Sequence, residues 1–259
     1  MMATANSKTR PAAGWKVITA FLMFVAGMIS ADEAQRKNFT AHASAEFQQA
    51  QTRFQADAAN PTNAWLFARA AFNYAEFATS DAQRAALAEQ GIAACRQLVA
   101  RDPKSAAAHY YLAMNLGQLA RTKFLGALKL VKEMDREFKT AGELDPRLDY
   151  AGPERNLGLL YRDAPGWPAS IGNKRTARHY SEQATKLVPD YPANHLNLVE
   201  SYLLWDERDD AKRELKVLDA IWPAARTNLT GEAWAANWDD WATRREAARK
   251  KINETATHP

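Results

Sequence analysis

The sequence predicts an all-α fold in which helix pairs stack into a solenoid. Alanine is abundant and β-branched residues are sparse, which favours helices over strands. Before four regularly spaced prolines, small or apolar residues recur in steps of four and three, which keeps them on one helical face. A non-repetitive helical bundle is the alternative. With a fifth, leading proline the intervals are 42, 43, 43 and 34 residues, at Pro61, Pro103, Pro146, Pro189 and Pro223.

An interval of 34 residues is the length of a tetratricopeptide repeat, a helix pair whose apolar face is covered by the next pair. Proline ends one helix and restricts the residue before it, so each proline sets a corner between units. We therefore predict a right-handed α-solenoid of tetratricopeptide-like helix pairs with a C-terminal capping helix. The predicted segments are an N-terminal helical half-repeat (32–60), four helix pairs with the first three extended (61–225), and the capping helix and tail (226–259).

The extra residues of the three extended units are predicted between the two helices of each pair, at 76–87, 120–129 and 164–172. The second insertion is expected to lengthen the helices. The third contains two prolines and two glycines, which forbid a continuous helix.

The last helix is expected to run from Gly231 to Ile252, with Thr230 as its N-cap. Trp234, Trp238 and Trp241 lie on one face of it, opposite a charged face. A solenoid needs a terminal cap with a polar outer face, so we interpret the tryptophan stripe as core rather than as a ligand site.

Residues 1–31 are predicted to be a secretory signal peptide. Three basic residues precede the apolar run Val17–Ile29, which is too short for a comfortable membrane span of about 20 residues. Cleavage is expected after Ala31, and an uncleaved membrane anchor is the alternative. Removal takes three positive charges from a formal net charge of +4, so no nucleic-acid affinity is inferred. The predicted location is periplasmic or secreted.

The sequence carries no recognisable catalytic signature. The single cysteine, Cys95, excludes an internal disulfide and has no paired base. The five histidines are scattered, and we interpret His109 and His195, at equivalent positions in two repeats, as packing residues rather than metal ligands. No phosphate-binding loop or nucleophile elbow is present. We expect a non-enzymatic protein with no cofactor and no metal site.

Two segments carry a resemblance to a known family. They are Ala120–Lys129 with Phe138 and Glu143–Pro146, and Gly152–Lys174 with Ala184 and Asn194–Leu196. Over roughly residues 90–205 the chain resembles the T-component family of TRAP transporters, which are bacterial periplasmic tetratricopeptide proteins. The resemblance implies a helical solenoid, a periplasmic solute-binding protein as partner, homo-oligomers, and a cleft for a small, often apolar, anionic ligand. The described type is a lipoprotein, whereas this chain departs from it in having no lipid-acceptor cysteine.

The first helix of each pair lines the concave surface of such a solenoid, which places a candidate groove on this chain. Aromatic walls with a few polar groups are typical of a ligand or peptide site. Arg155 and Arg162 lie two turns apart on one face, and the arginine fork can bond both oxygens of a carboxylate. The alternative is that they pair with Asp163 or Glu154. The candidate residues are Phe67, Tyr74, Tyr110, Tyr111, Met114, Arg155, Asn156, Arg162, Trp167 and Asn197.

Three of these residues have alternative predicted roles. Asn156 and Asn197 fall at equivalent places in adjacent repeats, where they either clamp an extended peptide backbone or bond neighbouring helices. Trp167 either closes the groove mouth over a ligand or pins its own loop onto the repeats.

These observations predict a non-enzymatic periplasmic helical-repeat binding protein. One hypothesis is an accessory of a TRAP-type transporter that contacts a solute-binding protein and binds a small carboxylate or apolar ligand. The alternative is a general tetratricopeptide scaffold that binds a peptide or assembles an envelope protein complex. No nucleic-acid partner is expected.

Overall fold

The computed structural model describes residues 33–123 and 126–254, and within these ranges it contains ten α-helices and no β-strand. The predicted all-α solenoid is confirmed. The predicted signal peptide (1–31) lies outside the described residues. The helices are α2 (Glu33–Ala56), α3 (Pro61–Glu76), α4 (Asp81–Arg101), α5 (Ala106–Arg121), α6 (Ala127–Leu144), α7 (Leu148–Asp163), α8 (Lys174–Leu187), α9 (Pro192–Leu204), α10 (Arg208–Asn228) and α11 (Glu232–Glu254).

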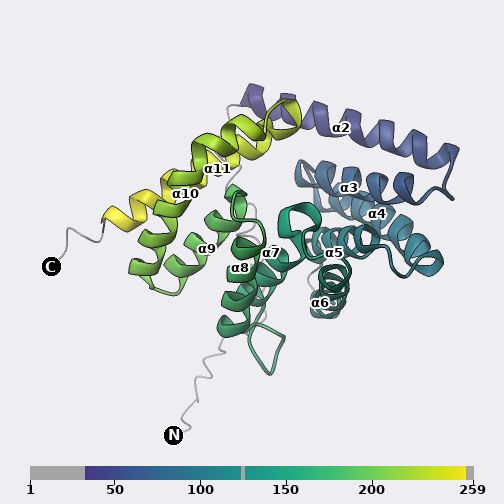
Figure 1. Ribbon diagram of the computed structural model, residues 1–259. Coiled ribbons are helices and arrows are strands. Elements are labelled where there is room, and N and C mark those ends of the chain that lie inside the picture. Colours follow the sequence, from purple (N-terminus) through teal and green to yellow (C-terminus); the bar gives the residue numbers. More distant parts are fainter. Residues whose placement is uncertain (1–32, 124–125, 255–259) are drawn as a thin grey trace, which may run out of the picture.

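Consecutive helices pack in pairs, α3 with α4, α5 with α6, α7 with α8, and α9 with α10. The pairs follow one another along a curved path, with α2 packed on α3 at one end and α11 packed on α9 and α10 at the other (Figure 1). Among the described helices, none is long and apolar enough to cross a membrane.

Short polar side chains fix where several helices begin. The Asn60 side chain accepts hydrogen bonds from the backbone N–H groups of Thr62 and Asn63, directly before Pro61 starts α3. Ser80, Ser105 and Asn173 cap α4, α5 and α8 in the same way. Each cap satisfies an N–H group that the first helical turn leaves unpaired, which stabilises the helix by about 1 kcal/mol.

Small residues let neighbouring helices approach closely, both within a pair and between successive pairs. A Cβ atom added to Gly91 would overlap the Asn115 side chain, and one added to Gly158 would overlap Ser181. The large buried side chains of the central repeats, among them Tyr110 and Phe138, fill one continuous core. The repeat pattern of small and apolar residues therefore sets the spacing of the helices.

The tryptophan stripe of α11 belongs to a second core, as predicted. Trp238 and Trp241 are buried against Leu215 and Leu218 of α10. Trp238 Nε1 also donates a hydrogen bond to the Leu229 carbonyl at 2.7 Å, which fastens the turn before α11.

One prediction about helix ends is confirmed only in part, and another is wrong. The segment 120–129 does not simply lengthen the helices, because α5 ends at Arg121 and Gly126 adopts a left-handed φ of 86° that stops α6 from extending backwards. Pro223 does not form a corner, because α10 continues through it to Asn228. Proline has no N–H group, so the Asp219 carbonyl four residues earlier lacks its usual helical donor. Pro223 is exposed, so water can reach that carbonyl.

Candidate functional site

The concave side of the solenoid forms one large groove of about 1810 Å³. Its walls come from the first helix of each pair, α3, α5, α7 and α9, and from the two terminal helices, α2 and α11, and Arg208 at the start of α10 adds to them. The structure therefore places the groove on the surface that the repeat geometry predicts, with two additional walls.

Polar contacts between α2 and α11 bridge the groove on the remaining side. Gln35 Nε2 donates a hydrogen bond to Asp239 Oδ1 at 3.2 Å, across 204 positions of sequence. His42 lies 3.4 Å from the Glu232 carboxylate and 3.5 Å from that of Glu46. Figure 1 shows α2 running along the top of the molecule towards α11. These contacts bridge the two ends of the solenoid across the groove, which stays partly open to solvent.

Six of the ten predicted residues line this groove, from α5, α7 and α9. Those six are Tyr111, Met114, Arg155, Asn156, Arg162 and Asn197. Leu159, Glu200 and Leu203, on the same helical faces, line it too.

The other four predicted residues lie elsewhere. Phe67 and Tyr74 turn away from the groove because their rings pack against Phe47 of α2. Tyr110 is fully buried between α5 and α7. Trp167 neither closes the groove nor pins its loop, because 88% of its surface is exposed and it lines no part of the groove.

The groove arginines are already paired within the chain. Arg162 donates two hydrogen bonds to Asp163, at 2.7 and 2.9 Å, and its side chain is largely buried. Arg244 of α11 donates to both oxygens of Glu200 at 2.8 Å. Arg162 is therefore paired with Asp163, which is the alternative to carboxylate binding that the sequence predicts.

The predicted asparagines bond within the chain too. Asn156 Nδ2 donates to the Tyr110 hydroxyl at 3.1 Å and to the Gly152 carbonyl at 2.9 Å. Asn197 Oδ1 accepts a hydrogen bond from Arg244 Nη2 at 2.5 Å. Both amides therefore bond neighbouring helices, which is the second of the two roles predicted for them.

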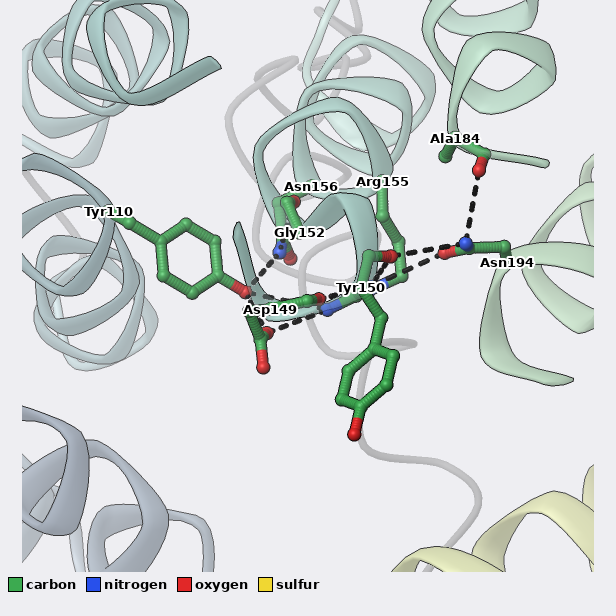
Figure 2. Close-up of polar contacts among 8 residues, drawn as sticks. All are labelled: Tyr110, Asp149, Tyr150, Gly152, Arg155, Asn156, Ala184 and Asn194. Carbon is green, nitrogen blue, oxygen red and sulfur yellow. Dashed lines mark hydrogen bonds and ion pairs between the residues drawn. The ribbon is translucent and has the colours of Figure 1, made fainter. Parts of the chain in front are cut away.

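A dense polar network fixes the start of α7 at the groove wall (Figure 2). Arg155 donates to the Asp149 carboxylate at 2.8 Å and to the carbonyls of Asp149 and Tyr150, each at 3.0 Å. The Tyr110 hydroxyl donates to the same carboxylate at 2.5 Å, and Asn194 of α9 donates to the Tyr150 carbonyl at 3.1 Å. The network links three consecutive repeats.

This network holds an unusual backbone. Asp149, Tyr150 and Ala151 all have left-handed φ angles, between 48° and 60°. Such a conformation costs a non-glycine residue roughly 1–2 kcal/mol. The next residue must be small, because a Cβ atom on Gly152 would overlap the Tyr110 hydroxyl. The turn aims the Tyr150 ring into the groove, where it stacks on Tyr191 with ring centres 4.4 Å apart.

Charge and burial shift the pKa values of these groups. Burial raises the pKa of the Tyr110 hydroxyl, and the nearby Asp149 carboxylate raises it further. Burial disfavours the Arg155 charge, yet the Tyr110 and Asp149 side chains outweigh it and keep the pKa of Arg155 above its ordinary value. The tyrosine is therefore neutral and the arginine charged at physiological pH, as a structural role requires.

An apolar side pocket of about 60 Å³ opens beside the groove between α3, α5, α6 and α7. Its lining includes Phe72, Met114, Met134, Phe138 and Leu159. Glu76 and Asp163 border both the side pocket and the groove. The Glu76 carboxylate accepts hydrogen bonds from Gln118 and, at 3.1 Å, from Arg121.

Sequence reasoning missed the contributions of α2 and α11. Phe39 and His42 line the groove from α2, and Trp234, Trp241 and Arg244 line it from α11. Trp234 and Trp241 therefore pack in the second core and also form part of the groove wall. No periodic signal in the repeats points to these residues, because their position depends on how far the whole solenoid curves.

No group of three or more metal-ligating side chains occurs among the residues that the structure describes. Cys95 is fully buried, and burial, reinforced by Glu137, raises the pKa of its thiol. A thiol in this state is a poor nucleophile, in keeping with its interpretation as a small core residue.

Comparisons with known proteins agree with the fold. The family described as "Regulator of microtubule dynamics protein 1-3" matches residues 28–150, somewhat less than half of the chain. A thermophilic tetratricopeptide protein of Thermus thermophilus, TTC0263, matches with a TM-score of 0.59 and 18% identity over 92% of this chain and 100% of its own. MamA matches with a TM-score of 0.50 and 16% identity over 76% of this chain and 98% of its own. No curated protein matches the sequence.

These matches do not support the resemblance to the T-component family of TRAP transporters, and the transporter role stays a prediction. What the structural likenesses establish is the fold: the chain is a tetratricopeptide-type α-solenoid.

Proposed function

We propose that this protein is a helical-repeat scaffold that binds an extended segment of a partner protein in its concave groove. The observation that carries the proposal is the groove itself, about 1810 Å³ in volume and lined from seven helices. Sites for small molecules typically measure about 300–1,000 Å³. A passage of this size suits several residues of polypeptide better than one small ligand.

The chemistry of the walls supports a peptide. Tyr150, Tyr191 and Trp234 form an aromatic cluster on the groove surface, with Tyr191 and Trp234 ring centres 6.3 Å apart. Aromatic side chains provide large contact areas at a low cost in side-chain entropy. The name of the matching family, which refers to regulation of microtubules, points in the same direction, towards a protein partner.

The walls give less support to a small anionic ligand. Arg155 and Arg162, the residues predicted to hold its carboxylate, are bonded to Asp149 and Asp163. A ligand carboxylate would have to displace these intramolecular partners at no net gain in charge pairing. The transporter-accessory hypothesis therefore needs a ligand held by other means.

The test is selection of peptides that bind the purified chain, followed by mapping. A random peptide library is displayed on phage, and binders are measured by fluorescence anisotropy against Ala247→Trp, which places a large ring on the exposed groove face of α11. Ala242→Trp is the matched control, exposed on the same helix outside the groove. We expect the first variant alone to abolish binding. Binders that tolerate both variants, or a library that yields none, would count against the proposal.

A further inference from the structure

Carboxylates are the more numerous charged groups on the groove surface. Among its lining residues, eight aspartate and glutamate side chains face six arginine and lysine side chains. Two of the carboxylates, Glu46 and Glu232, share the imidazole of one residue, His42. The surface offered to an occupant is therefore acidic overall.

The arrangement within the ion pairs strengthens this asymmetry. In the Arg155–Asp149 pair, 10% of the arginine side chain is exposed against 34% of the aspartate. In the Arg121–Glu76 pair the fractions are 7% and 19%. In these two pairs the cation lies behind the carboxylate, which presents the accessible oxygens, whereas the partners are about equally exposed in the Arg162–Asp163 and Arg244–Asp240 pairs.

The apolar side pocket lies next to two of these carboxylates. Glu76 and Asp163 belong to its border, while Met114 and Leu159 belong to both the pocket and the groove. A site for one water needs about 10–15 Å³, so a pocket of about 60 Å³ has room for the end of one aliphatic side chain. Methionine side chains adapt to the shape of such a guest, and two of them line the pocket.

We propose that the groove selects a cationic segment that carries an aliphatic anchor residue: lysine or arginine side chains meet the groove carboxylates, and a leucine-like side chain enters the pocket between Met114, Met134 and Leu159. This inference rests on the proposed function, because it names the chemistry of the segment that the groove binds. It reverses the charge of the ligand that the sequence predicts, since the arginines that suggested an anion are neutralised from within the chain.

The test uses three labelled dodecapeptides of equal length: alternating lysine and leucine, glutamate in place of every lysine, and serine in place of every leucine. Affinities are measured by fluorescence anisotropy with the full chain at two salt concentrations. We expect the lysine–leucine peptide to bind about tenfold or more tightly than either counterpart, with affinity falling as salt rises, because exposed charges are screened.

Variants test separately the preference for a cationic segment and the preference for a leucine anchor. Glu232→Lys should weaken the lysine–leucine peptide, whereas Glu89→Lys, an exposed carboxylate of α4 outside the groove, should not. Met114→Trp fills the pocket and should remove the preference for leucine over serine. Gly117→Ala is the milder second variant, because its Cβ atom would lie 3.1 Å from the flexible end of Met134.

The outcomes separate this inference from the proposed function. Groove-dependent peptides that prefer neither charge, or that favour glutamate, overturn the cationic preference while leaving peptide binding in place. Equal affinity for leucine and serine peptides in the unmodified chain overturns the anchor pocket. Failure of every peptide in the groove, including those selected from the library, overturns both.

Discussion

Arg155 shows how a residue with the chemistry of a ligand site acts inside the fold. Its guanidinium makes five hydrogen bonds, to the Asp149 carboxylate and carbonyl, the Tyr150 carbonyl, the Asn194 side chain and the Tyr110 hydroxyl. The ring of Tyr191 lies against it, with its centre 5.1 Å from the guanidinium carbon. A planar fork is needed to reach several acceptors at once, which explains arginine at this position.

We expect Arg155→Ala to destabilise the fold. Removing one partner of a buried ion pair costs about 3–5 kcal/mol, and the loss here falls near the lower figure because Asp149 is partly exposed. Arg155→Lys should recover only part of the loss, since lysine keeps the charge without the fork. Chemical denaturation measures both variants. Equal stability of Arg155→Ala and the unmodified chain would show that the left-handed turn at Asp149–Ala151 forms without the Arg155 hydrogen bonds.

Two histidines form the same clamp in different repeats. His109 Nδ1 lies 2.5 Å from the Glu137 carboxylate and its Nε2 lies 3.0 Å from the Pro103 carbonyl. His195 repeats the arrangement with Glu214 at 2.5 Å and the Pro189 carbonyl at 2.6 Å. Each clamp ties the proline corner before a helix to the second helix of its pair, so both histidines are packing residues with a specific polar task.

We expect His195→Ala to lower the melting temperature more than the double variant His195→Ala, Glu214→Gln. The single change leaves a largely buried carboxylate without its imidazole, whereas a neutral glutamine costs less to leave unpaired. Thermal unfolding followed by circular dichroism gives both values. A double variant that is no more stable than the single one would contradict the clamp.

At the scale of helices, the C-terminal cap α11 is fixed to α9 by charge as well as by tryptophan packing. Arg244 binds both oxygens of Glu200 and also Asp240 at 2.9 Å. Burial would raise the pKa of Glu200, but the charge and hydrogen bonds of Arg244 outweigh it and hold this pKa below its ordinary value of 4.5. The ionised carboxylate is therefore the form that the folded protein favours.

We expect α11 to become less stable in acid. Because the folded pKa of Glu200 lies below the unfolded one, its contribution is complete above about pH 4.5 and is lost as the pH falls through the folded value. Tryptophan fluorescence reports the change through Trp234, Trp238 and Trp241. Glu200→Gln should melt lower than the unmodified chain at neutral pH, and the difference should shrink in acid. A difference in melting temperature that stays constant with pH would mean that packing alone, and not the Glu200 charge, stabilises α11.

The helix pairs could be predicted because their signals are local. Proline spacing, the small residues at Gly91 and Gly158, and the polar caps all act within one or two repeats. The left-handed turn at Asp149–Ala151 carries no such signal, since none of its residues is glycine. The corner predicted at Pro223 is absent because an exposed helix tolerates a proline when water reaches the freed carbonyl.

The groove was predictable only on its inner wall. Repeat geometry placed Tyr111, Met114 and Asn197 correctly, because one face of each first helix points inward. Phe67 and Tyr74 were misplaced because α2 packs over the end of the solenoid and covers them. The α2 and α11 walls depend on curvature summed over all four pairs, which no single segment encodes.

At the scale of the molecule, the contact between the two terminal helices is the weakest link around the groove. It includes the polar side-chain contacts of Gln35 with Asp239 and of His42 with Glu232, and Glu232 is largely exposed. Exposed pairs of this kind contribute about 0–1 kcal/mol each. The apolar cores beneath α2 and α11 are much larger, so thermal motion is expected to separate these two helices before it disturbs the pairs.

This difference predicts that a partner segment enters where α2 and α11 meet. Cysteines at both positions in a Gln35→Cys, Asp239→Cys variant can be joined by a short bismaleimide linker, and the native Cys95 does not interfere because it is fully buried. Linking should slow both association and dissociation of a groove-bound peptide in stopped-flow fluorescence, while the Gln35→Cys variant treated with the same reagent keeps the original rates. Both rate constants fall because closure obstructs entry and exit alike, so the equilibrium affinity changes much less than either rate. Unchanged rates in the linked protein would mean that the segment threads through an end of the passage without opening it.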